Sequence, residues 1–252
     1  MSKARLTLEV LLVLGLSLGM SALYSIVSIS VRLAREVALS EQTATLNRSL
    51  SEYEWADFIY QILGIVSSLV PVALVMYLLW QAQPPRFGAL GIDATRPGRD
   101  GAWGFGLAAL IGIPGLGLYL VGRELGLTVT VVPSALDDYW WSIPMLILLA
   151  LRAGLVEEII AVGYLFNRLR LLHVPVIGII VIQAFLRATY HLYQGFGAFL
   201  GNFVMGLVLG YWYAKTGRLV PLIAAHTLID VVAFVGYPLA MDSFPEILGN
   251  VG

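Results

Sequence analysis

The chain has 252 residues, of which 59% are hydrophobic and only 12% charged, whereas soluble domains carry about a quarter charged residues. A water-soluble fold could not cover this much apolar surface, so the composition predicts an integral membrane protein. The net charge is -1 and no long run of one sign occurs, which argues against nucleic acid as a partner. Because the chain has no cysteine, disulfides, thiolate metal ligands and a cysteine nucleophile are excluded.

Seven apolar stretches follow one another along the chain, each bounded by Pro, Gly or charged residues. A helix needs about 20 apolar residues to cross a bilayer. The first stretch is longer than the apolar core of a signal peptide, about 7 to 15 residues, so we interpret it as a span. The predicted spans cover residues 8–31, 58–80, 103–121, 143–165, 174–190, 199–213 and 219–237. The expected fold class is all-α, a polytopic transmembrane bundle of about seven helices that forms one membrane domain.

The distribution of Lys and Arg in the loops predicts the orientation. With a cytoplasmic N-terminus, nine basic residues lie inside, namely Lys3, Arg5, Arg86, Arg96, Arg99, Arg168, Arg170, Lys215 and Arg218, and four outside, namely Arg32, Arg35, Arg48 and Arg123. We therefore expect an N-terminus in the cytoplasm, the cell membrane as location and, with seven spans, a C-terminus outside.

Ionisable side chains inside spans cost roughly 2.5 to 3.5 kcal/mol each, so those that occur need a reason. Here they cluster late in the chain, at Arg152, Glu157, Glu158, Arg187, His191, His226 and Asp230. His226 and Asp230 are four residues apart and share one helix face. Glu157 and Glu158 are about 100° apart around a helix, so one should face a cavity while the other bonds a neighbouring helix.

A purely structural interpretation is open at this point. Arg152 and Arg187 would neutralise Glu157 and Glu158 as buried ion pairs, with nothing catalysed. The convergence of two His, two Glu and one Asp from three separate spans instead favours a functional site.

Three motifs occur in a fixed order. They are Glu157-Glu158 with Gly163-Tyr164-Leu165, then Tyr190-His191-Leu192-Tyr193-Gln194-Gly195, then His226-Thr227-Leu228-Ile229-Asp230. Together they resemble the CPBP family of intramembrane proteases, which joins CAAX prenyl endopeptidases with bacteriocin-processing and immunity-type (Abi-type) membrane proteins. The likeness spans residues 152–234. We accordingly expect residues 1–102 to hold N-terminal spans and loops of unassigned role, and residues 103–252 to form a CPBP-like catalytic core.

The chain departs from the family pattern at two positions. The family Arg that lies four residues after the second Glu falls on Val162, and the Phe that lies four before the His falls on Arg187. We hypothesise that Arg187 supplies, from the fifth span, the positive partner that Val162 cannot. A lesser departure is Asp230, where the family has Asn or a similar residue.

Peptide hydrolysis needs a water made nucleophilic and a group that stabilises the oxyanion. By resemblance, Glu157 with His191 holds and deprotonates water. Glu158 positions the neighbouring side chains or forms an ion pair with one of them. His226, oriented by Asp230, stabilises the oxyanion, while Arg187 and Arg152 support the cluster. The resemblance thus implies a membrane-embedded endopeptidase that acts on a membrane-associated peptide or protein in the lipid bilayer.

A divalent metal such as Zn²⁺ is an alternative, because Glu157, His191 and His226 make a two-His, one-carboxylate set such as catalytic zinc uses. Against it, no His-Glu-x-x-His motif occurs and the two His lie on different helices. No other cofactor is predicted. Measured from the expected cytoplasmic ends at about 1.5 Å per residue, His191 lies roughly 25 Å deep and His226 roughly 10 Å. Tilt, a break near Pro175 or different span ends must bring them level.

Two other functions remain open. A non-catalytic immunity or scaffold protein would keep the fold, with Val162 marking decay of the active site. A small proton-coupled transporter would also use intramembrane Glu and His. That reading predicts broken helices related by internal repeats, which the sequence does not contain.

Overall fold

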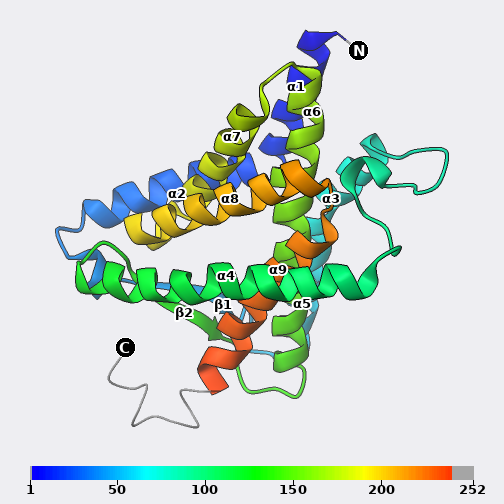
Figure 1. The fold of residues 1–252 in the computed structure, drawn as a ribbon. Helices are drawn as coiled ribbons and strands as arrows, with labels where there is room; N and C mark the ends of the chain where they lie inside the picture. Colours follow the sequence, from blue (N-terminus) through cyan, green and yellow to red (C-terminus); the bar gives the residue numbers. More distant parts are fainter. Residues whose placement is uncertain (1, 240–252) are drawn as a thin grey trace.

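The computed structural model describes residues 2–239 and is mostly helical (Figure 1). The α-helices are α1 (Lys3–Gly15), α2 (Leu18–Leu33), α3 (Glu54–Leu78), α4 (Pro97–Glu124), α5 (Ser142–Glu157), α6 (Leu165–Leu171), α7 (Val176–Tyr190), α8 (Phe196–Thr216) and α9 (Val220–Val231). In the described part of the chain, η3 (Glu158–Tyr164) and η5 (Val232–Gly236) are π-helical, and η1 (Leu39–Glu41), η2 (Gly88–Leu90) and η4 (Leu192–Gln194) are short 3-10 turns. The strands are β1 (Thr43–Arg48) and β2 (Thr130–Ala135).

Each of the seven predicted spans falls on helix, but the count of about seven spans is not confirmed. Within residues 2–239, four helices are long and apolar enough to cross a membrane: α3, α4, α8 and the helix Val220–Leu239. A fifth is present if α1 and α2, which meet at an angle of 55°, form one broken span. The chain is therefore an integral membrane protein with four or five candidate spans.

The other two predicted spans fall short for different physical reasons. Helix α7 has 15 residues, about 22 Å at 1.5 Å per residue, which is less than the roughly 30 Å hydrocarbon core. Segments α5, η3 and α6 form one continuous helical rod, but it carries Arg152, Glu157 and Glu158 near its middle. Three charges there exceed what an apolar span contains.

The all-α prediction omitted a small parallel sheet. Strand β1 pairs with β2, and Thr43 lies opposite Thr130. Both strands lie between predicted spans, and β2 begins within the β-branched stretch Thr128–Val132. A parallel pair requires a crossover connection, which α3 and α4 provide here.

The helix type changes from α to π beside the Glu157-Glu158 motif and beside the motif that ends at Asp230. The rod passes from α-helix to π-helix at Glu158, and all seven residues of η3 are buried. Helix α9 passes into η5 at Val232, two residues after Asp230. Because π-helical turns shift the phase of every following side chain, they re-aim the residues around them and are frequent at functional sites.

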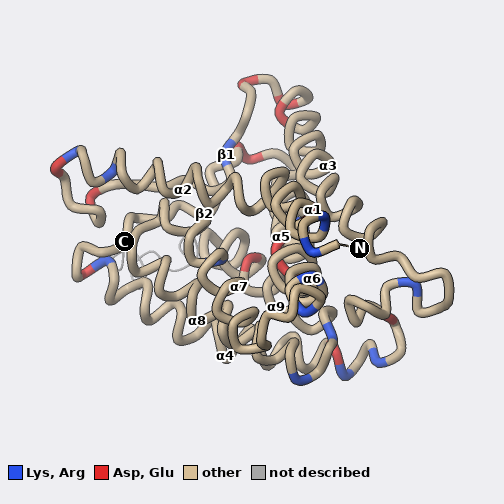
Figure 2. The backbone as a smooth tube through the Cα atoms, turned by 90° about the horizontal axis from the view of Figure 1, so that it is seen from above, with Lys and Arg blue, Asp and Glu red and all other residues tan. Residues whose placement is uncertain are grey.

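Close helix packing brings the three motif-bearing helices together. Helix α9 packs against α4 and α5, and α7 packs against α8 and α2. A Cβ added at Gly154 of α5 would lie 2.6 Å from Thr227 Oγ1 of α9, and one at Gly206 of α8 would lie 2.6 Å from Ala184 Cα of α7. Charged residues lie mostly in the loops and at helix ends, with long uncharged stretches between them (Figure 2).

Candidate active site

The site residues come from three places in the fold. Glu157 ends α5 and Glu158 begins η3, Arg187 lies in α7 with His191 directly after it, and His226 and Asp230 lie in α9. The structure brings these residues into one cluster, as the motifs predict.

The two adjacent glutamates separate as expected. The Glu157 side chain is 14% exposed and lines a cavity, whereas the Glu158 side chain is 0% exposed. Glu158 Oε1 accepts hydrogen bonds from Arg187 Nη2 at 2.5 Å and from His226 Nδ1 at 2.7 Å. One carboxylate therefore faces the cavity and the other ties two neighbouring helices to the rod.

Arg187 takes the position that the sequence hypothesis gave it. Its guanidinium is fully buried and also donates from Nη1 to Glu157 Oε2 at 3.2 Å. Val162, on which the family Arg falls, is fully buried in the apolar core. The positive partner of the glutamates thus comes from α7 instead of from the rod.

Arg152 does not pair with the glutamates, so this part of the structural interpretation was wrong. Within residues 2–239 it forms no ion pair within 4.0 Å, and it lies in the wall of the cavity. The reason is spacing, because side chains five apart on a helix, such as Arg152 and Glu157, do not lie over one another as those three or four apart do.

His226 is held chiefly by Glu158. An ionised carboxylate only accepts hydrogen bonds, so the proton of this bond is on His226 Nδ1. His226 Nε2 lies 3.7 Å from Asp230 Oδ2 and 3.9 Å from Glu157 Oε2, in ion-pair range but beyond hydrogen-bond distance. The prediction gave the orienting role to Asp230, whereas the direct bond comes from Glu158.

His191 has a defined tautomer as well. Its Nδ1 lies 3.1 Å from the backbone oxygen of Arg187, and a carbonyl only accepts, so Nδ1 carries a proton. In the neutral ring, Nε2 then has the lone pair. His191 shares the cavity wall with Glu157. The expected depth difference does not separate the two histidines from Glu157, because His191 shares a cavity wall with Glu157 and His226 Nε2 lies 3.9 Å from Glu157 Oε2. Helix α7 is inclined to the rod (Figure 1).

The cavity has a volume of about 420 Å³ and a mixed polar and apolar wall. Its wall is formed by Leu16, Ser17, Leu18, Ser21, Ser67, Ser68, Pro71, Arg152, Ala153, Val156, Glu157, Tyr190, His191 and Tyr193. The sequence analysis missed the contribution of the break between α1 and α2, of α2 and of α3 to this wall. Serines scattered in apolar spans carry no signal that would have identified them.

Tyr190 was also missed as a site residue. Its hydroxyl donates a hydrogen bond to Glu157 Oε2 at 2.7 Å. The available signal was its spacing, because Tyr190 follows Arg187 by three residues and so lies on the same face of α7.

The proposed metal ligands do not fit a metal centre. In the part of the chain that the structure describes, no three His, Cys, Asp or Glu side chains are placed to hold a metal ion together. Glu157 and His191 line the cavity, but His226 is not part of its wall, so the three proposed ligands do not face one common space. We therefore derive no step through a metal.

Comparison with known proteins identifies a family for the part of the chain that holds this cluster. Residues 139–232 match the family model described as type II CAAX prenyl endopeptidase Rce1-like, which is consistent with the CPBP family. This match confirms the resemblance predicted from the motifs, and it includes every predicted site residue from Arg152 to Asp230. No curated protein and no solved structure matches the chain.

Proposed function

We propose that this chain, part of which matches a protease family, is a membrane-embedded peptidase of the CPBP type that hydrolyses a peptide bond in a membrane-associated peptide or protein. One observation carries the proposal. The Glu157 carboxylate faces a cavity whose wall is partly polar, while its Oε2 accepts hydrogen bonds from Tyr190 and Arg187. A fixed carboxylate beside a space that admits water is the arrangement that a general base requires.

The geometry supports Glu157 Oε1 as the proton acceptor. Within residues 2–239, the hydrogen bonds to Glu157 all end on Oε2, which leaves Oε1 for a water molecule. His191 lines the same cavity and has its Nε2 lone pair available. In our proposal, these two residues hold the attacking water.

The reaction then balances without any further reactant. Glu157 takes a proton from the water, and the resulting hydroxide oxygen bonds to the carbonyl carbon of the substrate. The carbon–nitrogen bond breaks as the tetrahedral intermediate collapses. The proton held by Glu157 passes to the leaving amine, so the carboxylate is regenerated.

We assign oxyanion stabilisation to Arg152, which differs from the role expected for His226. A donor must lie about 2.7 to 3.1 Å from the position of the oxyanion, so it must reach the cavity. Arg152 lines the cavity, and within residues 2–239 it has no ion-pair partner, whereas His226 is not part of the wall. His226 acts here as a positioning residue, with Glu158 and Arg187, behind Glu157.

The test is cleavage of membrane-anchored candidate substrates by purified protein in lipid vesicles. We expect Glu157→Gln to lose about 10²- to 10⁴-fold in rate, the usual contribution of a general base. The amide keeps the shape of the side chain and can still accept from Tyr190, so folding should persist. The matched control is Glu52→Gln, an exposed glutamate outside the cavity, which should cleave as wild type does.

Two further measurements sharpen the result. Arg152→Ala should slow cleavage with little change in thermal stability, whereas His226→Ala should lower both. A chelator should have no effect on the wild type. If Glu157→Gln cleaves normally, or if Glu157→Ala preserves the cellular function, the non-catalytic immunity or scaffold function replaces this proposal.

A further inference from the structure

A second, almost entirely apolar groove lies between α4 and α8, apart from the catalytic cavity. It has a volume of about 600 Å³. Its walls are Trp103, Gly106, Leu107 and Leu110 of α4 and Leu207, Val208, Tyr211 and Trp212 of α8. None of these residues is part of the catalytic cavity wall, so the groove is a separate feature of the molecule.

The groove follows from the residues on one face of α4. Its lining positions there recur every three to four residues, and one of them is Gly106. No atom lies within 4 Å of the position that a Gly106 Cβ would occupy, so the missing side chain leaves the groove open. From Trp103 to Leu110 the groove runs about 10 Å along the helix at 1.5 Å per residue. That length is within one leaflet of a bilayer, about 15 Å of hydrocarbon.

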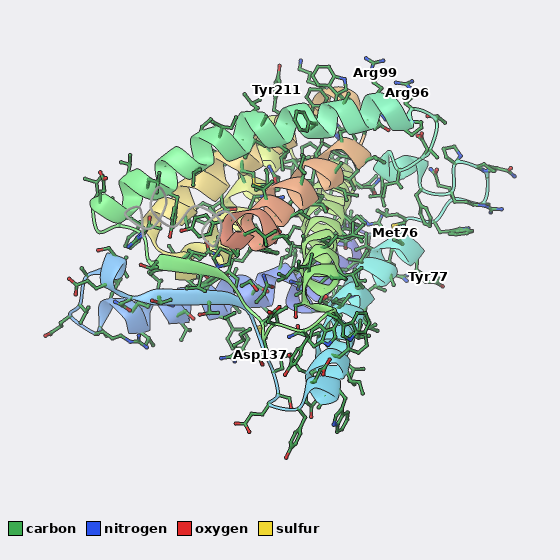
Figure 3. All side chains as sticks on the ribbon, turned by 90° about the horizontal axis from the view of Figure 1, so that it is seen from below. Met76, Tyr77, Arg96, Arg99, Asp137 and Tyr211 are labelled. Atoms are coloured by element: carbon green, nitrogen blue, oxygen red, sulfur yellow. The ribbon has the colours of Figure 1, made fainter. Side chains whose placement is uncertain are left out.

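Aromatic rings and cations gather at one end of this groove. The rings of Trp103 and Trp212 lie 4.6 Å apart, and Lys215 Nζ lies 5.6 Å from the centre of the Tyr211 ring. Arg99 lies one helical turn before Trp103. Figure 3 shows Arg96, Arg99 and Tyr211 projecting outward along the α4 side of the molecule. Trp and Tyr with Lys or Arg beside them are typical of the level of lipid headgroups.

The charge at this end is positive after local pairing. Residues 93–103 and 211–218 contain four basic side chains, Arg96, Arg99, Lys215 and Arg218, and two carboxylates, Asp93 and Asp100. Arg218 pairs with both carboxylates, at 3.0 Å from Asp93 and 2.5 Å from Asp100. In residues 2–239, the other three cations have no carboxylate within 4.0 Å.

We propose that this groove binds an anionic phospholipid, with an acyl chain between α4 and α8 and the phosphate group near Arg99 and Lys215. The apolar walls match hydrocarbon, and the surplus positive charge favours a headgroup with net negative charge over a zwitterionic one. This site is independent of the proposed peptidase activity.

The test uses the two tryptophans of the groove as reporters. Purified protein is placed in vesicles of brominated phosphatidylglycerol or of brominated phosphatidylcholine with the same chains, and tryptophan quenching is measured. The double variant Trp103→Phe/Trp212→Phe gives the signal of the other four of the six tryptophans. We expect the groove tryptophans to be quenched preferentially by phosphatidylglycerol in mixtures of the two lipids.

Two pairs of variants separate specific binding from ordinary lipid contact. Gly106→Leu should fill the groove and lower quenching, whereas Gly117→Leu, on the same helix and also with no atom within 4 Å, should not. Arg99→Gln and Lys215→Gln should each lower the preference about fivefold, the typical effect of one basic residue near an anionic lipid surface. Arg5→Gln, an exposed cation at the start of α1, should leave it unchanged.

Equal quenching by the two lipids would mean ordinary annular lipid and would overturn the proposal. So would identical behaviour of Gly106→Leu and Gly117→Leu, because the groove would then hold no chain. Neither readout involves cleavage, so a failure here leaves the proposed peptidase untouched, and a failure of the peptidase leaves this site untouched.

Discussion

Arg187 and Glu158 form an ion pair that solvent does not reach: Arg187 Nη2 lies 2.5 Å from Glu158 Oε1, and both side chains are 0% exposed. The pair joins α7 to the π-helical part of the rod, and the same Glu158 oxygen accepts from His226 of α9. Three helices are thus connected through one buried carboxylate. Removing either charge would take the shortest of these bonds from the other charge in an apolar core.

We predict that Arg187→Leu destabilises the protein by roughly 3 to 5 kcal/mol, the usual cost of leaving a buried charge without its partner. The measurement is unfolding in detergent, followed by tryptophan fluorescence. The exposed Arg35→Leu serves as control and should change little. The double variant Arg187→Met/Glu158→Met should be less destabilised than the sum of its single variants, because it removes both charges of this ion pair together. Wild-type stability of Arg187→Leu would show that the pair contributes nothing.

Tyr190→Phe tests the support of the general base. The change removes the hydroxyl that donates to Glu157 Oε2 at 2.7 Å and keeps the ring. A hydrogen bond to a charged group contributes about 1.5 kcal/mol or more, so we expect kcat to fall about tenfold or more. Tyr193→Phe removes a hydroxyl from the same cavity without touching Glu157, and it should preserve kcat. Equal effects of both changes would argue against a specific role for Tyr190.

The sequence predicted the positions of the helices better than their nature as spans. Apolar content identified all seven helical stretches, but it could not show that α7 ends after 15 residues or that η3 interrupts the rod. Those features depend on tertiary packing, such as the contacts that bury every residue of η3. Strands β1 and β2 also depend on each other, since they are 82 residues apart between Arg48 and Thr130 and pair only in the folded chain.

The site residues were predictable where a charged side chain stands in an otherwise apolar helix. Charged residues in apolar helices stand out, and the angle between adjacent positions was enough to predict that Glu157 and Glu158 point apart. The partners of each charge were less predictable, because they depend on side-chain placement. Arg187 pairs with the glutamates, as hypothesised, whereas Arg152 does not within residues 2–239. Tyr190 was missed as a partner of Glu157, although it belongs to the second motif and follows Arg187 by three residues.

Acid should weaken the contact between the loop before α4 and the α8–α9 connection. Hydrogen bonds from Arg218 and Thr95 lower the pKa of Asp93, so the folded state holds this proton less readily than the unfolded state. The stabilisation is therefore complete above the ordinary Asp pKa, about 4, and is lost as the pH falls through the lower folded value. Asp93→Asn should have a lower Tm than wild type at neutral pH and a smaller loss of Tm below pH of about 4.

The control for this prediction is another aspartate on the surface. Asp137 is exposed and lies across the molecule from Arg96, which follows Asp93 by three residues (Figure 3). Within residues 2–239 the Asp137 carboxylate makes no ion pair. Asp137→Asn should therefore follow the wild-type dependence of Tm on pH. A parallel pair of curves for wild type and Asp93→Asn would contradict the assignment to Asp93.

The close approach of α5 and α9 should be essential for the geometry of the site. A Cβ at Gly154 would lie 2.6 Å from Thr227 Oγ1 and 3.1 Å from the backbone oxygen of Ile223. Gly154→Ala must therefore move α9 away from α5, and it would carry His226, the residue before Thr227, away from Glu158. We expect a loss of about 1 to 3 kcal/mol, the usual cost of overpacking a core, and slower cleavage.

Gly115→Ala provides the matched control on α4, because no atom lies within 4 Å of its Cβ position. Alanine favours a helix by about 1 kcal/mol over glycine, so this variant should be as stable as wild type or more so, with unchanged cleavage. Thermal unfolding and cleavage of both variants decide the matter. If Gly154→Ala behaves as Gly115→Ala does, α9 can adjust without disturbing His226, and the close approach is not what places this residue beside Glu158.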